Sequence, residues 1–218
     1  MSDLLTQLNG GSVPTLDILM LTTFAALIPS IVVMMTSFTR TIIILSFTRN
    51  AMGVQQAPPN MVIVGITLFL TLYIMNPVIQ RINEEAYQPY RNEEITQEEA
   101  VERAMEPLKE FMVRNTYKST LDNFVRMSNT PEQEQAIDYP LTVIVPSFMT
   151  SELKRGFTAG FLIYLPFLLV DVIVSTTLMS MGMVMLPPAM ISMPFKLLLF
   201  VTVDGGELLF SSIVQSFH

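Results

Sequence analysis

Four long stretches of this chain hold at most one charged residue each, and they limit its possible folds more than any other feature. Residues 18–39 and 61–80 carry no charge, residues 156–186 carry only Asp171, and residues 189–203 carry only Lys196. An apolar run of about 20 residues can cross the hydrocarbon core of a bilayer as a helix. Half of all residues are hydrophobic and 14% are charged, which is unusual for a soluble domain. The sequence therefore predicts a membrane protein.

Prolines lie inside or beside nearly every apolar segment: Pro29, Pro77, Pro146, Pro166, Pro187, Pro188 and Pro194. Each proline frees a backbone carbonyl that needs a new partner, which favours kinked helices buried against other protein over isolated spans. We expect an all-α membrane protein whose kinked, Pro-broken hydrophobic helices form hairpins and assemble into an oligomer.

The chain divides by composition into residues 1–80, 81–140 and 141–218. Arg40 and Arg49 lie between the first two apolar segments, so the basic-side rule places that link in the cytoplasm. The polar middle region would then be extracytoplasmic. The N-terminus has no basic residue before Arg40 and does not resemble a secretory signal, so the first apolar run is expected to stay. Residues 140–150 form a separate apolar stretch that is too short to span.

The middle region is acidic and is predicted to form short amphipathic helices. Thr96 and Glu99 make a capping box. Apolar residues follow at helical spacing, first Ala100, Val101, Ala104, Leu108, Phe111 and Met112, then Leu121, Phe124 and Val125. These stripes either pack on each other or form a subunit interface, with Phe111 and Phe124 as the expected anchors. Glu152, a charge in an apolar neighbourhood, is expected to pair across a subunit interface.

Residues 172–195 are uncharged and rich in methionine. Met179, Met181, Met183, Met185, Met190 and Met193 surround Pro187 and Pro188. Adjacent prolines prevent one continuous helix, and methionine lets neighbouring groups repack, which suits a constriction that closes and reopens. The pattern suggests a gate. Plain packing filler and thioether ligands for Cu(I) are the alternatives, although residues two apart point in different directions on a helix.

Catalytic signatures are scarce. The sequence has no Cys, its one His is His218, and it contains no HExxH, Gly-x-Ser-x-Gly or Walker motif. Asp171 and Asp204 are candidate intramembrane carboxylates, and an aspartyl protease would have them share a proton. The alternative is that Asp171 pairs with Lys196 or Arg155. The net charge of -7 comes mostly from residues 84–138 and implies no nucleic-acid partner.

Longer segments resemble a known family. Residues 36–79 (TSFTRTIIILSFTRNAMGVQQAPPNMVIVGITLFLTLYIMNPVI) resemble the N-terminal signature of the FliP family of flagellar type III export-gate proteins. Residues 145–157 (VPSFMTSELKRGF) and 161–205 (FLIYLPFLLVDVIVSTTLMSMGMVMLPPAMISMPFKLLLFVTVDG) resemble its C-terminal signature. Together these segments cover nearly half of the chain.

The resemblance implies a non-enzymatic, multi-pass protein of the bacterial inner membrane, in the flagellar basal body, without cofactor or metal. Roughly five copies would form an oligomer with FliQ and FliR and work with FlhA and FlhB. The channel would export unfolded rod, hook and filament proteins. A virulence injectisome subunit is the alternative within the same class. The family's apolar segments are largely lifted out of the bilayer within the assembly.

The family's pore gasket, a methionine run after a glycine, corresponds to Met183, Val184 and Met185 after Gly182. Val184 departs from methionine, and its β-branched side chain is stiffer. Pro187 and Pro188 would turn the gasket into the pore, with Met179 and Met181 supporting it. Gly206 also departs from the family, which usually has tryptophan there.

Overall fold

The computed structural model contains helices and no strand among the residues that it describes, which are all except 1–21, 24–25, 27–28, 55–56, 184 and 218. A short helix, Pro29–Met35, precedes α3. The labelled helices are α3 (Phe38–Ala51), α4 (Asn60–Ile82), a π-helical turn (Asn83–Tyr87), α5 (Gln88–Arg91), α6 (Gln97–Arg114), α7 (Lys118–Ser128), a 3-10 turn (Ala136–Asp138), α8 (Leu141–Ser180), α9 (Pro188–Thr202) and α10 (Gly205–Gln215). The fold is all-α, as predicted.

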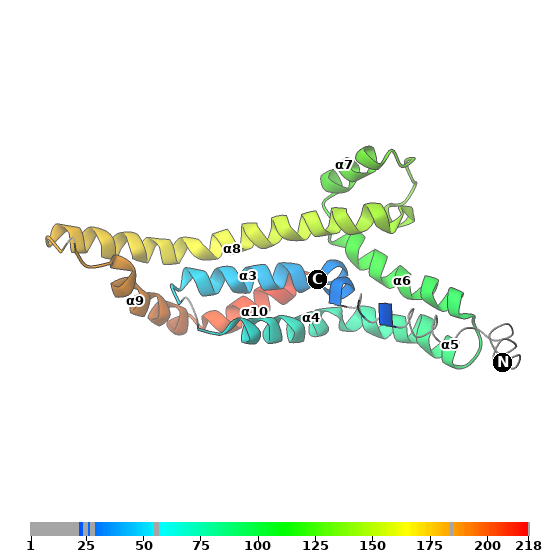
Figure 1. Ribbon diagram of the computed structural model, residues 1–218, viewed down its shortest axis with the longest axis horizontal. Helices are drawn as coiled ribbons and strands as arrows, with labels where there is room; N and C mark the ends of the chain where they lie inside the picture. The colour runs from blue at the N-terminus through cyan, green and yellow to red at the C-terminus, as the bar shows by residue number, and fades with distance from the viewer. Residues whose placement is uncertain (1–21, 24–25, 27–28, 55–56, 184, 218) are drawn as a thin grey trace, which may run out of the picture.

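Helix α8 is the long axis of the molecule (Figure 1). Its 40 residues correspond to about 60 Å at the α-helical rise, roughly twice the thickness of a bilayer hydrocarbon core. The sequence led us to expect an apolar segment at 156–186 and a separate short stretch at 140–150. Instead one helix runs through both and includes Glu152, Pro146 and Pro166. The prediction of two separate apolar stretches was wrong. Hydrophobicity alone does not show that a helix continues through charged residues whose partners lie elsewhere in the chain.

Helix α3 lies between α8 and α4 (Figure 1). Gly156 and Gly160 of α8 are four residues apart and face α3, where a Cβ on Gly156 would meet Ile43 at 3.1 Å. Small residues at this spacing let two helices approach closely in an apolar environment. The contact between α3 and α8 is therefore set by glycine, a signal present in the sequence that our reading of it missed.

We expect Gly160→Ala to destabilise the contact between α3 and α8 by about 1–3 kcal/mol, because overpacking forces neighbouring side chains or backbone to shift. The added Cβ would lie 2.6 Å from Cγ and 2.9 Å from Cβ of Phe47, atoms too near the backbone to swing away. Thermal unfolding of the detergent-solubilised chain measures the change. Gly65→Ala in α4 is the matched control, since a Cβ there has no atom within 4 Å. The control should be neutral or slightly stabilising; equal destabilisation by both changes would contradict the contact.

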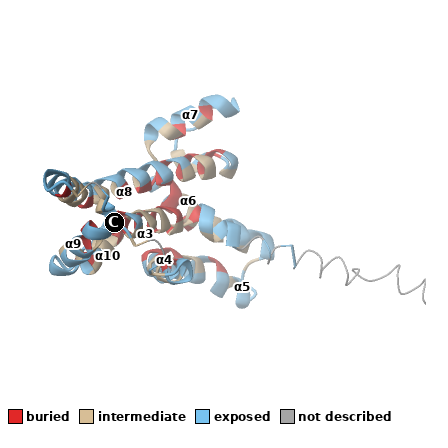
Figure 2. Cartoon of the chain, turned by 60° about the vertical axis from the view of Figure 1, so that its left-hand side comes forward, coloured by how far each residue is buried: buried red, intermediate tan, exposed pale blue. Residues whose placement is uncertain are grey.

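The polar middle region packs on the first turns of α8. Helix α6 begins at the expected capping box, in which Thr96 Oγ1 accepts from the Glu99 backbone N–H at 3.3 Å. The apolar stripes of α6 and α7 face the same core as α8, through buried Met112, Leu121 and Val125. In Figure 2 the buried residues line the inner faces of the helices and the outer faces are exposed.

The surface of several helices reverses the pattern of a soluble protein. Ser192 and Lys196 are the buried residues of α9, whereas Met190, Phe195 and Leu198 on the same helix are exposed. In α4 the buried set includes Thr67 and Thr71. Polar groups turned inward and apolar groups turned outward are typical of helices in an apolar medium. The chain is therefore built to be surrounded by lipid or by other apolar protein.

Two helices, Asn60–Arg91 and Leu141–Ser180, are long and apolar enough to cross a membrane. Two bent pairs could add one span each: Pro29–Met35 with α3, bent by 80°, and α9 with α10, bent by 64°. The first bend changes our interpretation of residues 18–39. Helix α3, the second helix of this pair, does not end at residue 39 but continues through Arg40 and Arg49. Arg40 is 2% exposed and lies in no loop, so it does not support the topology inferred from it.

Candidate functional site

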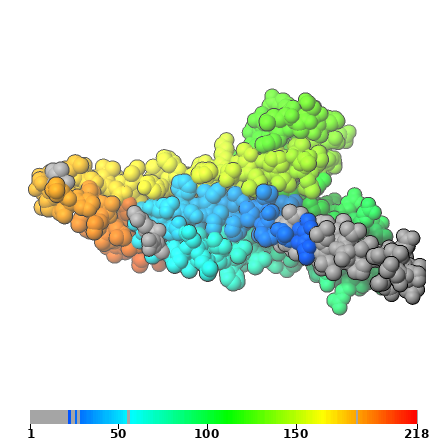
Figure 3. Space-filling view, in the orientation of Figure 1, coloured from blue at the N-terminus to red at the C-terminus, as the bar shows by residue number. Residues whose placement is uncertain are grey.

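The methionine-rich turn joins α8 to α9 at the far end of the molecule from α7 (Figure 3). Helix α8 ends in a Schellman motif: the Met183 N–H donates to the Leu178 carbonyl at 3.0 Å and the Gly182 N–H to the Met179 carbonyl at 3.1 Å. Gly182 has φ +76°, which disfavours any residue with a Cβ. Pro187 then caps α9, and Pro188 is its first residue. The predicted break in the helix is confirmed.

Among the described residues, most methionines at the turn have little cover from the rest of the chain. Met185 is 95% exposed, and Met179 and Met181 are also exposed. Met183 is half-buried. Val184, the middle residue of the predicted gasket, lies outside the described residues. Exposed apolar side chains gathered at one tip mark a surface that contacts another apolar partner, so the turn is the candidate functional site.

A charged cluster holds the two limbs of the α8–α9 hairpin together. Lys196 Nζ of α9 lies 2.6 Å from Asp171 Oδ2 of α8, and Ser192 Oγ donates to Asp171 Oδ1 at 2.6 Å. Of the two partners considered for Asp171, Lys196 is therefore the one found. Asp204 is exposed and precedes α10. The carboxylate of Asp171 is held by a lysine and a serine, an arrangement unlike two aspartates that share one proton.

Lys196→Met should loosen the hairpin, since among the described residues it leaves Ser192 as the one donor to the partly buried Asp171 carboxylate. Removing one partner of a buried ion pair costs about 3–5 kcal/mol, and the 28% exposure of Asp171 moves our expectation to the lower end. Limited proteolysis at the methionine-rich turn and thermal unfolding would both detect the change. Ser192→Ala, which keeps the ion pair, should cost about 1 kcal/mol. The exchanged pair, Asp171→Lys with Lys196→Asp, should recover part of the loss; no recovery would argue against the ion pair as the cause.

A second ion pair lies in the core, between α3 and α8. Arg40 binds Glu152 through two hydrogen bonds, one of them from Nε to Oε2 at 3.0 Å. Arg40 Nη1 also donates to the Ser216 carbonyl at 2.9 Å, and its guanidinium lies 3.7 Å from the ring centroid of Phe217. The cluster therefore joins three segments far apart in the sequence. The sequence pattern predicted only a topological role for Arg40.

The three residues predicted for the subunit interface are found in different settings. Glu152 is 0% exposed and pairs with Arg40 of the same chain, which differs from the expected pairing across subunits. Phe111 is buried as well, 5.9 Å from Phe148 between ring centroids. Phe124 is half-buried on α7. A role of Glu152 or Phe111 in assembly would therefore act through the shape of the subunit. Phe124 is partly exposed and is therefore available for direct contact with another subunit.

These features define an all-α membrane protein whose longest helical hairpin ends in an exposed, methionine-rich turn. A family model described as the FliP family matches residues 20–213. The chain belongs to the FliP family, as the motifs in the sequence predicted.

Several curated proteins are similar to this chain, and each is named flagellar biosynthetic protein FliP. The protein of Pectobacterium carotovorum is 49% identical over 96% of this chain and 82% of its own length. The protein of Aquifex aeolicus is 46% identical over 96% and 89%, and that of Bacillus subtilis is 47% identical over 93% and 92%. These names favour a flagellar role over a copper transporter or an intramembrane protease.

Proposed function

We propose that this chain is a channel subunit of the flagellar type III protein export apparatus. The observation that carries the proposal is the family match over residues 20–213, which includes the hairpin and its turn. The subunit has no catalytic role. It passes unfolded rod, hook and filament proteins outward, and the energy comes from other components of the apparatus.

The outward apolar faces support an assembled state in the bacterial inner membrane. Helix α8 alone exposes a row of large apolar side chains that includes Phe157, Phe161, Leu165 and Leu169. A monomer in water rarely exposes so large an apolar surface. In the proposed assembly, copies of this chain cover these faces together with FliQ and FliR, and the complex works with FlhA and FlhB.

In the assembly, the exposed turn between α8 and α9 closes the pore at rest. Met183, Val184 and Met185 form the seal, and apolar constrictions of this kind exclude water and ions. Gly182 and Pro187 fix where the turn begins and ends. Met179 and Met181 lie exposed beside it and support the seal.

Deletion of the gene in its own bacterium tests this function. We expect loss of swimming and loss of hook and filament protein from the medium, both restored when the chain is supplied from a plasmid. Loss of effector secretion with normal swimming would instead indicate a virulence injectisome. Normal export in the deletion strain would overturn the proposal.

A further inference from the structure

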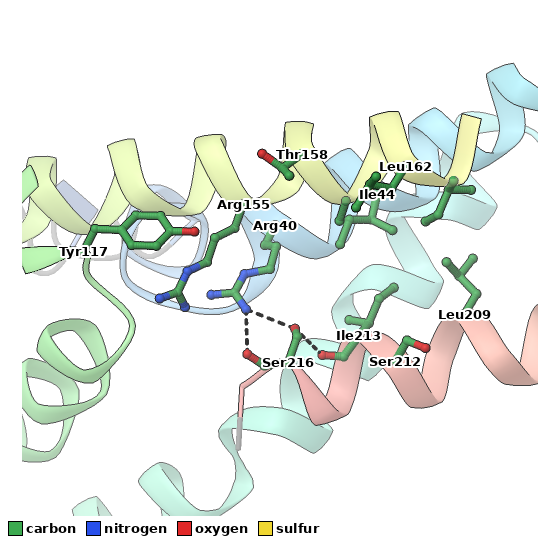
Figure 4. A pocket seen from close by; sticks show the side chains of 12 residues that line it. Arg40, Ile44, Tyr117, Arg155, Thr158, Leu162, Leu209, Ser212, Ile213 and Ser216 are labelled. Carbon is green, nitrogen blue, oxygen red and sulfur yellow. Dashed lines mark hydrogen bonds between the residues drawn. The ribbon is translucent and has the colours of Figure 1, made fainter. Parts of the chain in front are cut away.

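A cavity of about 330 Å³ lies between α8 and α10, beside the buried Arg40–Glu152 pair. Figure 4 shows that Tyr117, Arg155 and Arg40 lie at one end of this cavity and that Leu162 and Leu209 lie toward the other. Arg155 and Leu162 are seven residues apart on one face of α8. The cavity therefore has a cationic end and an apolar end.

The charges at the cationic end do not balance. Glu152 neutralises Arg40 through two hydrogen bonds. Arg155 donates to the amide oxygen of Asn115 at 3.4 Å, and its guanidinium lies 4.6 Å from the ring centroid of Tyr117. Within the described part of the chain, Arg155 forms no ion pair with a carboxylate. Among the described residues, two arginines thus face one glutamate, and one positive charge at the cavity has no carboxylate partner.

The other end of the cavity is mostly apolar, and Ser212 is its polar lining residue. Leu162 of α8 and Leu209 and Ile213 of α10 line this end together with Ile44 of α3. Leu162 is exposed on its outer side, so the apolar end opens to the surroundings. An occupant that satisfies both ends needs an anionic group joined to an apolar tail.

The place of the cationic end along α8 also fits an amphiphilic ligand. Lys154 and Arg155 are the last charged residues before an uncharged stretch that reaches Asp171. Lys154 Nζ lies 5.2 Å from the same Tyr117 ring. Basic residues with a tyrosine at the start of an apolar surface are typical of the level of lipid headgroups.

We propose that this cavity binds an anionic phospholipid, with the phosphate on Arg155 and an acyl chain along Leu162, Leu209 and Ile213. The guanidinium supplies planar donors that match phosphate geometry. A carboxylate from a second copy of the chain would balance Arg155 but leave the apolar end unfilled. The inference needs only that the chain meets lipid, so it does not rest on the export function.

Native mass spectrometry of the full chain in neutral detergent tests the site with phosphatidylglycerol and phosphatidylcholine as probes. We expect one phosphatidylglycerol per chain, bound at least about tenfold more tightly than phosphatidylcholine. The choline cation of phosphatidylcholine offsets the charge of its phosphate, whereas phosphatidylglycerol keeps a net negative charge. Arg155→Leu should abolish this preference, whereas Arg155→Lys, which keeps the charge but loses the planar donors, should keep only part of it. Leu209→Trp should weaken binding of both lipids by filling the apolar end.

The control is Arg103→Leu, which removes the same charge from an exposed position on α6 and should leave the preference unchanged. Equal binding of the two lipids to the unaltered chain would overturn the proposal. Displacement of the lipid by equimolar inorganic phosphate would also overturn it, because the site would then bind a free anion. If Arg155→Leu lowers the fraction of oligomer and leaves lipid binding unchanged, the cavity belongs to a second copy instead.

Discussion

Glu152→Ala should lower the free energy of unfolding by about 3–5 kcal/mol, because it leaves the Arg40 guanidinium buried without its counter-charge. Arg40 and Glu152 are 2% and 0% exposed, respectively. Arg40 also holds the carbonyl of Ser216, so the end of α10 should loosen with it. Thermal unfolding of the detergent-solubilised chain and recovery of assembled complexes measure the two effects.

Two further variants separate the ion pair from simple truncation. Arg40→Leu combined with Glu152→Leu removes both charges and should recover much of the stability, since replacing a buried pair by apolar groups is often nearly neutral. Glu110→Ala is the matched control, because its pair with Arg81 is 42–44% exposed and exposed pairs contribute at most about 1 kcal/mol. Equal losses from Glu152→Ala and Glu110→Ala would contradict the account of Glu152.

The second large effect is expected at the turn between α8 and α9. Met183→Ala, Val184→Ala and Met185→Ala combined should cause a several-fold rise in ion leakage across the membrane of cells that also express the export partners. Truncation widens an apolar constriction, which then fills with water and conducts ions. The end of α8 should keep its conformation, because the hydrogen bonds that Gly182 and Met183 donate there join main-chain atoms and do not involve the truncated side chains.

Met127→Ala serves as the control for this experiment. Met127 is also an exposed methionine, but it lies on α7, at the other end of α8 from the turn (Figure 1), so its loss should cause no leakage. Assembly of each variant is checked by recovery of the complex. Unchanged leakage from assembled triple variants would show that the seal lies elsewhere and that these methionines only fill space.

Several helices could be predicted closely from composition. The uncharged run 61–80 lies within α4, Asn60–Ile82, and the run 189–203 nearly coincides with α9, Pro188–Thr202. Pro59 and Pro187 immediately precede these helices, at positions where a missing N–H costs no helical hydrogen bond. The capping box at Thr96 marked the start of α6 in the same way. Local rules sufficed here because each boundary depends on residues within one turn.

Other features depend on partners distant in the sequence and could not be read from it. Arg40 and Glu152 are 112 positions apart in the sequence, which hides their pairing. The sequence pattern therefore places Arg40 in a link between apolar segments and Glu152 at a subunit interface. The start of α8 at Leu141 was missed for a related reason: its charged residues are satisfied by other segments. Gly156 and Gly160 can be seen in the sequence, but only the structure shows that α3 is the helix that packs against them.

The sequence alone therefore determined the medium, the helical class, the family and the break at Pro187 and Pro188. These follow from charge-free length, backbone chemistry and motifs, which are properties of contiguous residues. Only the tertiary structure decided which charges meet, which faces of α8 and α9 turn inward and where a cationic cavity opens. Those features are set by helix packing, in which close approach and the need to pair buried charges select one arrangement among many that the same helices would allow.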